Sequence, residues 1–328
     1  MKELIKSLAS HVAPSGTEAG FQNILLDHVK EIADDVFIDT LGNGIATKNG
    51  KGPHIMLAAH ADEPGVMVIH IDKKGFLRLI PVGNMNPISL IGRHIRFVNG
   101  VTGIVGVESK VKTKDIAFDN LYVDIGVSSL EQAKGKVNIG LEGVILEPVV
   151  ELDDNILIGR ALDNRVGCSI AIEVFKQAAL EGYHISLVFT AQQTVGARGA
   201  KTATFRLQPD LAIVIDAVPA GDMPDAEQMD IKLGAGPAIK IMDGTAIVPL
   251  DVKDHLLDSA KAAGVEVQHE VWPKSLTDAG SIQLSVDGIP VGGVSYPARY
   301  VGSPSTMVDL RDAAGAVDVI VEAIRRKN

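Results

Sequence analysis

The stretch that decides the fold reads Ile185-Ser186-Leu187-Val188-Phe189-Thr190-Ala191-Gln192-Gln193-Thr194-Val195-Gly196-Ala197-Arg198-Gly199-Ala200. The apolar run that ends at Thr190 predicts a buried strand, and the polar and glycine-rich residues after it predict a loop. Ligands of open α/β sheets gather beyond the carboxyl ends of the strands. Polar residues just past such strands, Gln192 and Gln193 here, are therefore candidates for function.

Helical and strand patterns alternate on both sides of this stretch. Residues 163–180, 251–263, 278–286 and 311–326 have helical spacing of apolar residues, whereas residues 55–59, 211–216, 265–271 and 290–296 read as short buried strands. Such alternation favours an α/β fold with a mostly parallel sheet and helices on both faces. We assign residues 1–68 and 158–328 to this split domain.

Between these two parts, residues 69–157 show short strands separated by glycine turns and little helical pattern. This composition predicts a small β-rich domain inserted into the α/β domain. A small sheet leaves edges and apolar faces that a single domain covers poorly. We therefore expect the insert to mediate formation of a homodimer.

Composition limits the partners of this chain. Its 41 acidic and 31 basic residues give a net charge of −10 over 328 residues, which argues against nucleic acid and anionic membrane as partners. Cys168 is the single cysteine and lies in an apolar stretch, so no intrachain disulfide is expected. The N-terminal residues do not follow the order of a signal peptide, and a cytoplasmic location fits these observations.

Four further polar residues are candidates for function. His60 and Asp216 follow apolar strands, Asp163 opens a helical pattern, and Asp62 lies two residues after His60, on the same face of an extended chain. A metal-bound imidazole usually needs an acceptor on its other nitrogen, and a nearby carboxylate such as Asp62 could be that acceptor. Each residue alone has an ordinary alternative, because a histidine after a strand is more often structural and an aspartate at a helix start is often only a cap.

Together, His60-Ala61-Asp62-Glu63, Asp163-Asn164-Arg165, Asp216, Thr277-Asp278-Ala279-Gly280 and the segment after Thr190 resemble the cytoplasmic tetrahedral aminopeptidases over nearly the whole chain. This metallopeptidase family includes glutamyl and deblocking aminopeptidases and endoglucanase-M-like proteins. The resemblance implies two zinc or cobalt ions bridged by Asp163, with His60 and Asp216 as further ligands of one ion. It also implies a catalytic role for Asp62, and substrate-binding roles for Glu63, Arg198, Thr277 and Asp278.

The sequence departs from the family pattern where the family carries its general base, a second glutamate and a late histidine. Gln193, Thr194 and Gly302 occupy these positions. An amide does not accept a proton near neutral pH, and neither a neutral hydroxyl nor a hydrogen replaces a carboxylate and an imidazole as metal ligands. We therefore expect one divalent ion, zinc or cobalt, with the second site empty and with weak or absent peptidase activity.

Two other functions stay open. A mononuclear metal-dependent aminopeptidase acting on peptide N-termini would need Glu63 or another acid to take the proton. A non-catalytic subunit, or a peptide-binding partner of an active paralogue, would need no base. The family resemblance also implies a hollow dodecamer built from dimers, although the family's Pro-Pro-His element after Ser109-Lys110 is missing and Val111-Lys112-Thr113-Lys114 follows instead.

Overall fold

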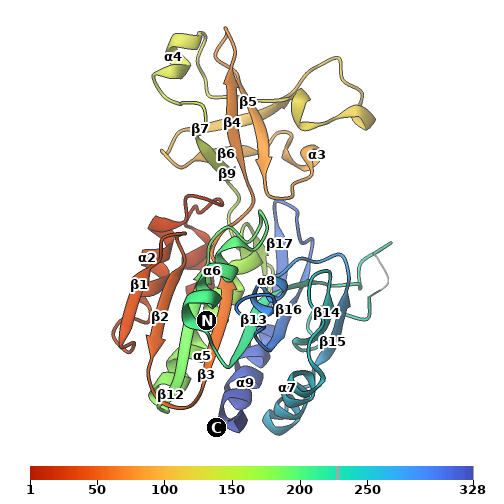
Figure 1. The fold of residues 1–328 in the computed structure, drawn as a ribbon. Helices are drawn as coiled ribbons and strands as arrows, with labels where there is room; N and C mark the ends of the chain where they lie inside the picture. The colour runs from red at the N-terminus through yellow and green to blue at the C-terminus, as the bar shows by residue number, and fades with distance from the viewer. Residues whose placement is uncertain (227–228, 328) are drawn as a thin grey trace.

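The computed structural model describes residues 1–226 and 229–327. An α/β body contains both termini, and a smaller barrel stands at one end of it (Figure 1). The chain enters the barrel after β3 and returns to the body before β10, so the body is built from the two ends of the sequence.

The body is organised around one sheet of eleven strands, in the order β1-β2-β12-β3-β13-β16-β17-β11-β10, with β14 and β15 added beside β16. Its strands are β1 (Asp35–Ile38), β2 (Gly44–Lys48), β3 (Lys51–His60), β10 (Val150–Glu151), β11 (Ile156–Gly159), β12 (Tyr183–Thr190), β13 (Leu211–Pro219), β14 (Ala238–Asp243), β15 (Gln268–Trp272), β16 (Val291–Arg299) and β17 (Thr306–Asp309).

The sheet is mixed, with a parallel centre. Strands β12, β3, β13 and β16 run parallel, and the pairs of β2 with β12 and of β17 with β16 are antiparallel. The alternation of helices and strands predicted the parallel centre correctly. It did not predict the antiparallel edges, whose pairing depends on which distant strand each one meets.

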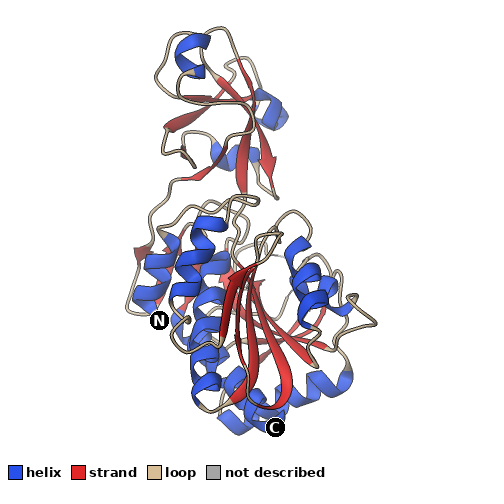
Figure 2. Ribbon diagram, turned by 60° about the vertical axis from the view of Figure 1, so that its left-hand side comes forward, coloured by secondary structure: helices blue, strands red, loops and turns tan. Residues whose placement is uncertain are grey.

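Helices cover both faces of this sheet (Figure 2). The helices of the body are α1 (Lys2–Ala9), α2 (Ala19–Asp27), α5 (Leu162–Leu180), α6 (Arg198–Leu207), α7 (Leu250–Ala263), α8 (Asp278–Gln283) and α9 (Leu310–Lys327). Alternate residues of β3 show the two faces: Leu57 and Ala59 join the core beneath α5 and α9, whereas Met56 and Ala58 join the core beneath α6 and α8. The predicted α/β fold with two covered faces is confirmed.

The inserted part is a closed barrel in the order β4-β5-β8-β7-β6-β9. Its elements are β4 (Gly65–Ile71), β5 (Leu77–Val82), α3 (Pro87–Leu90), β6 (His94–Phe97), β7 (Thr102–Val107), η1 (Thr113–Asp115), η2 (Phe118–Asn120), β8 (Leu121–Asp124), α4 (Leu130–Lys134) and β9 (Glu142–Ile145). Closure leaves the barrel without free edges, and its interior forms a separate apolar core.

The barrel does not coincide with the predicted insert, residues 69–157. Strand β4 begins at Gly65, and β10 and the first residues of β11 lie within the predicted insert but pair into the large sheet through β17. Within residues 1–226 and 229–327, no helix combines the length and apolar character needed to cross a membrane. A role of the insert in dimerisation stays a prediction.

Candidate metal centre

Three predicted ligands come together at one end of the parallel strands. His60 is the last residue of β3, and Asp216 lies level with it on β13 because Val214 pairs with Ala58. Asp163 reaches the same place from the start of α5. The distances from His60 Nε2 are 3.2 Å to Asp163 Oδ1 and 3.6 Å to Asp216 Oδ1.

The start of α5 is fastened to the sheet by the residue next to Asp163. Asn164 Nδ2 donates a hydrogen bond to the carbonyl oxygen of Ile215 at 2.9 Å, and the Tyr296 hydroxyl donates to Asn164 Oδ1 at 3.0 Å. These buried contacts hold Asp163 beside Asp216 on the neighbouring strand. The family-like Asp-Asn pair therefore supplies one pocket-facing carboxylate and one anchor.

The three side chains suit a cation both in their chemistry and in their positions. One ligand atom from each of His60, Asp163 and Asp216 lies within 4.8 Å of the others, and the described part of the chain contains no second such group. One imidazole and two carboxylates suit zinc and other divalent ions. The residues present thus fit one divalent ion.

Electrostatics at His60 also favour a cation. Burial lowers the pKa of the His60 imidazole, but hydrogen bonds with Asp163, Asp216 and Asp62 together raise this pKa well above its ordinary value. Burial raises the pKa of Asp216 despite its contact with His60. Positive charge is therefore stabilised at Nε2, the atom that a metal ion would take in place of a proton.

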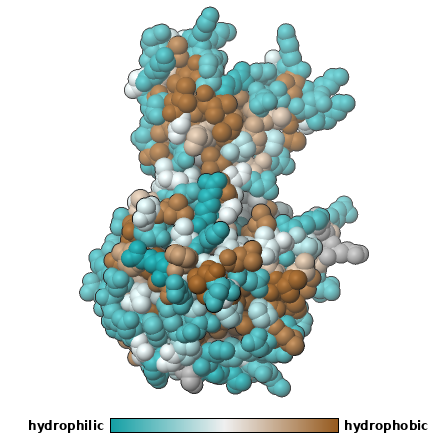
Figure 3. Space-filling model, viewed as in Figure 1, coloured by the Kyte–Doolittle hydropathy of each residue, from teal (hydrophilic) through white to brown (hydrophobic). Residues whose placement is uncertain are grey.

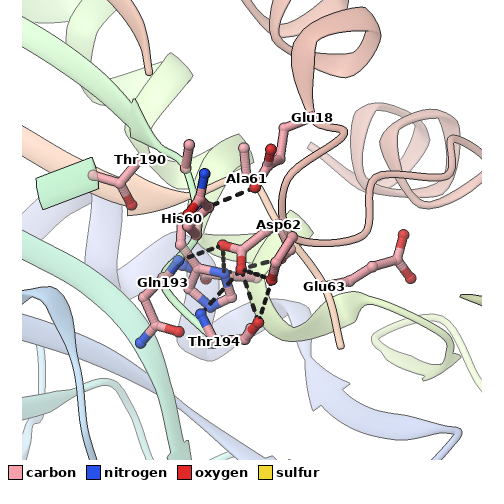
Figure 4. Close-up of polar contacts among 12 residues, drawn as sticks. Glu18, His60, Ala61, Asp62, Glu63, Thr190, Gln193 and Thr194 are labelled. Atoms are coloured by element: carbon pink, nitrogen blue, oxygen red, sulfur yellow. Dashed lines mark hydrogen bonds and ion pairs between the residues drawn. The ribbon is translucent and has the colours of Figure 1, made fainter. Parts of the chain in front are cut away.

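Asp62 contacts both His60 and the loop that follows β12. The His60 Nδ1 atom lies 3.0 Å from the carbonyl oxygen of Asp62, which fixes the ring with Nε2 toward the two carboxylates. The Asp62 carboxylate accepts from the backbone N–H groups of Gln193 and Thr194, both at 3.0 Å, and from the Ser15 hydroxyl at 2.5 Å (Figure 4). Burial opposes ionisation of Asp62, but these contacts and His60 lower its pKa to about 2. Asp62 is thus an anchor that is ionised near neutral pH.

Gln193 and Thr194 lie beside the triad, and neither side chain is acidic. The Gln193 Nε2 atom donates to the carbonyl oxygen of Leu276 at 2.9 Å. The Thr194 hydroxyl lies 2.9 Å from Asp62 Oδ2 and 2.5 Å from the Ser15 hydroxyl. Together with the triad they line a cavity of about 210 Å³, whose other walls are formed by Pro64, Ala217, Pro219, Trp272, Lys274, Ser275, Leu276 and Val301.

Gly302 lines an adjoining cavity on the other side of Asp163. It lies in the loop between β16 and β17 with a φ of +78°. A Cβ atom added there would meet no heavy atom within 4 Å, so the space for a larger side chain exists but the backbone conformation disfavours one. Gln193 and Thr194 thus share the metal pocket with Asp163, and Gly302 shares the adjoining cavity with it. The roles assigned to these three positions stay predictions.

Glu63 points away from His60 and Asp62 (Figure 4) and is 2% exposed. Its carboxylate forms ion pairs with Arg160 and with Arg165, the latter at 3.1 Å, and accepts from the backbone N–H of Ala13 at 3.0 Å. Two guanidinium groups therefore occupy the oxygens that a substrate or a proton would need. Glu63 is not among the walls of the metal pocket, but it lines the adjoining cavity together with Asp163 and Gly302. Its predicted role in substrate binding stays a prediction.

The other three predicted substrate-binding residues also lie outside the walls of that pocket. Arg198 begins α6 at the surface, where its Nη1 lies 3.2 Å from Gln192 Oε1. Thr277 caps α8 and donates to Asp243 at 2.6 Å. Asp278 is buried and accepts from the Thr190 hydroxyl at 2.6 Å, and burial raises the pKa of Asp278 to about 7. Their roles toward substrate stay predictions.

Some residues of the centre were not singled out from the sequence. Ser15 bonds to Asp62 across 47 positions, and Arg160 reaches Glu63 across 97 positions. Trp272, at the end of β15, and Leu276, in the loop that precedes α8, provide apolar walls. The only available signals were the Pro14-Ser15-Gly16 break and the Asp163-Asn164-Arg165 motif, neither of which identifies the partner.

Comparisons with known proteins agree with this geometry. The model of the M42 glutamyl aminopeptidase family matches residues 42–319. A relative from Acetivibrio thermocellus is 42% identical over 99% of this chain and 98% of its own length. The structure of an aminopeptidase from the archaeon Desulfurococcus kamchatkensis superposes with a TM-score of 0.93 at 34% identity, covering 98% of this chain and 93% of that one.

A second solved structure, the TET1 peptidase of Pyrococcus horikoshii, has a TM-score of 0.90 at 27% identity and covers 98% of both chains. That peptidase can assemble into a tetrahedron or a large octahedral shell. The family match, the extent of the identity and the site at the end of the parallel strands lead to one assignment: this chain belongs to the M42 glutamyl aminopeptidase family.

Proposed function

We propose that this chain binds one divalent ion, zinc or cobalt, through His60, Asp163 and Asp216, and receives peptide N-termini beside it with weak or no hydrolysis. One observation carries the proposal: the positions around Asp163 where the family places its base and second-ion ligands hold Gln193, Thr194 and Gly302. A bound ion at this triad would act as a Lewis acid toward a carbonyl oxygen or a water.

The residues of the pocket bind and orient better than they transfer protons. Asp163 and Asp216 are the acids among the described residues that line the cavity, and both belong to the triad. Asp62, with its pKa lowered to about 2, is a poor base near neutral pH. Gln193 offers an amide whose nitrogen is already committed to Leu276. These features support binding without efficient proton removal.

A mononuclear aminopeptidase is the second candidate. Catalytic zinc sites have three protein ligands and an open position, and His60, Asp163 and Asp216 supply a set of that size. This candidate needs a base, and the ion pairs of Glu63 argue against the acid that the sequence suggested. A third candidate, a non-catalytic subunit of an active paralogue, shares the geometry of the first.

Assembly forms part of the proposal. The peptidase of Pyrococcus horikoshii can assemble into a tetrahedron or a large octahedral shell. We propose that this chain forms homodimers through the inserted barrel, β4 to β9, and a dodecamer from such dimers. A cytoplasmic location remains a prediction from the sequence.

Metal content provides the test. Protein purified without chelator, then dialysed against zinc or cobalt, is expected to contain one ion per chain by mass spectrometry. Turnover of aminoacyl p-nitroanilides and dipeptides is expected to lie far below the ordinary enzymatic range of about 1–10³ s⁻¹. Two ions per chain, or turnover within that range, would contradict the proposal.

A further inference from the structure

We propose that a groove on the barrel, formed by the β4–β5 turn, β5, the end of β7 and β8, binds acidic peptide segments. The groove has a volume of about 660 Å³, within the range of roughly 300–1,000 Å³ that is usual for ligand sites. It shares no lining residue with the metal pocket, so this inference stands or falls separately from the proposed function. Its lining residues are Asp72, Lys73, Lys74, Phe76, Arg78, Val107, Glu108, Ser109, Lys110 and Tyr122.

The two acids of the groove are occupied by neighbours within the barrel. Asp72 Oδ1 accepts from the backbone N–H groups of Lys74 at 2.8 Å and of Phe76 at 3.0 Å, which closes the turn between β4 and β5. Glu108 forms an ion pair with Arg78 at 2.7 Å. Three cationic side chains remain for a ligand, those of Lys73, Lys74 and Lys110.

These lysines are exposed, and within residues 1–226 and 229–327 their ammonium groups form no ion pair or hydrogen bond with another residue. Lys112 and Lys114 continue the basic run after Lys110. This part of the barrel, residues 108–120, is the gold arm of Figure 1 and is mostly hydrophilic in the same view of Figure 3. The segment that follows the groove residue Lys110 therefore adds positive charge to this part of the barrel.

Charge is segregated between the two parts of the molecule. Residues 65–145 contain ten Lys and Arg against seven Asp and Glu, whereas the rest of the chain contains 21 against 34. The barrel is thus a basic module on an acidic protein. Opposite charge steers a ligand to such a surface, so an acidic segment is the complementary partner.

The groove also has a fixed aromatic surface. Phe76 and Tyr122 meet edge to face, with ring centroids 5.0 Å apart. A Cβ atom at Gly106 would lie 2.4 Å from the Tyr122 ring, so that ring packs directly on the backbone of β7. Rings packed in this way offer apolar contact to a peptide, whereas single-stranded nucleic acid needs free ring faces on which bases stack. The net charge of −10 also opposes a polyanion longer than the groove.

The test uses fluorescence anisotropy with a labelled peptide of ten residues in which glutamate alternates with serine. Matched probes are a lysine–serine peptide and a single-stranded oligonucleotide of ten thymidines. The variant K73E/K74E/K110E is compared with K134E/K136E/K261E, which makes the same change in net charge at exposed lysines outside the groove. Far-UV circular dichroism and melting temperature establish that both variants fold.

The wild-type protein is expected to bind the acidic peptide, with affinity falling as salt rises. The groove variant should bind it about tenfold more weakly or worse, and the control variant should resemble wild type. Equal loss in both variants, or no binding by wild type, would overturn the proposal. Tighter binding of the oligonucleotide would replace it with a nucleic-acid site. A change of oligomeric state in the groove variant, without any peptide binding by wild type, would replace it with a contact between copies of this chain.

Discussion

The residues around Asp163 fall into two groups with different chemistry, which we call the charged side and the neutral side. On one side, His60 and Asp216 complete a compact set of charged donors. On the other side, Gln193, Thr194 and Gly302 offer an amide, a hydroxyl and a bare backbone. The loop of the neutral side is nonetheless held firmly, because Asp62 accepts two of its backbone N–H groups. Backbone hydrogen bonds to Asp62 therefore hold this loop in place although the side chains of Gln193 and Thr194 are neutral.

The largest effect is expected when the neutral side receives ionisable side chains. The triple change Gln193→Glu, Thr194→Glu, Gly302→His is expected to raise the metal content from one ion to two. It should also raise peptidase turnover by about 10²–10⁴-fold, the usual contribution of a positioned acid–base group. Mass spectrometry and chromogenic substrates measure the two effects.

Gln193→Glu alone is the control for that variant. It supplies a base without a second set of ligands, so it should recover much less activity than the triple change. Equal activity of the single and triple variants would show that one ion suffices. A triple variant that folds, binds two ions and stays inactive would point to Pro64, which constrains Glu63 beside the pocket.

Removal of a ligand from the charged side should have the next largest effect. Asp216→Asn preserves the shape of the side chain but removes a charged metal ligand. It is expected to weaken zinc binding by about 100-fold or more, because even the loss of a residue that only hydrogen-bonds to a ligand usually costs about 10–100-fold. Thr194→Val is the matched change on the neutral side and should leave zinc affinity almost unaltered. Isothermal titration decides the contrast, since equal losses would mean that Thr194 belongs to the metal site.

Much of the charged side could be predicted from the sequence. His60 ends β3 and Asp163 opens α5, whereas Asp216 lies inside β13, which continues to Pro219 beyond the strand end expected from the sequence. The parallel pairing of β3 with β13 brings Asp216 level with His60. Local patterns of this kind survive in a single sequence because period and turn residues are encoded within a few positions. The same reasoning gave the β-rich character of the insert.

The rest depends on contacts between distant residues. Closure of the barrel, the ion pairs of Glu63 with Arg160 and Arg165, and the buried pair of Lys240 with Glu270 join residues 30 or more positions apart. No periodicity marks such partners. Helix α6 was missed because Arg198 to Leu207 is rich in polar residues and its apolar face is narrow.

Asp278, a buried acid outside the pocket, makes the stability of the protein depend on pH. Asp278 lies behind the charged side, with Oδ1 buried and unpaired, and burial raises its pKa to about 7. Because this folded-state pKa is above the ordinary value of 3.8, its contribution to stability is full below about pH 4 and is lost as pH rises toward 7. Asp278→Asn imitates the neutral acid and should remove this loss, on the order of 2–4 kcal/mol.

Urea denaturation of metal-free protein at pH 4, 5, 6 and 7 measures that difference. The gain of Asp278→Asn over wild type should grow with pH. Asp258→Asn, an exposed change on α7, is the control and should show no such trend. A constant difference across the series would mean that folding does not shift the pKa of Asp278.

The smallest effect concerns why Gly302 is a glycine. Its φ of +78° disfavours any side chain even though the space beyond is open, so Gly302→Ala is expected to cost about 1 kcal/mol in the free energy of unfolding. Gly20→Ala in α2, where the surroundings are also open but the backbone is helical, should instead stabilise the protein by about 0.5–1 kcal/mol. Opposite signs in urea denaturation would show that the backbone conformation of the loop resists any side chain at position 302, including the histidine of the triple variant. Stabilisation by both changes would show that the loop can leave the left-handed conformation, and the triple variant would then face no backbone obstacle at this position.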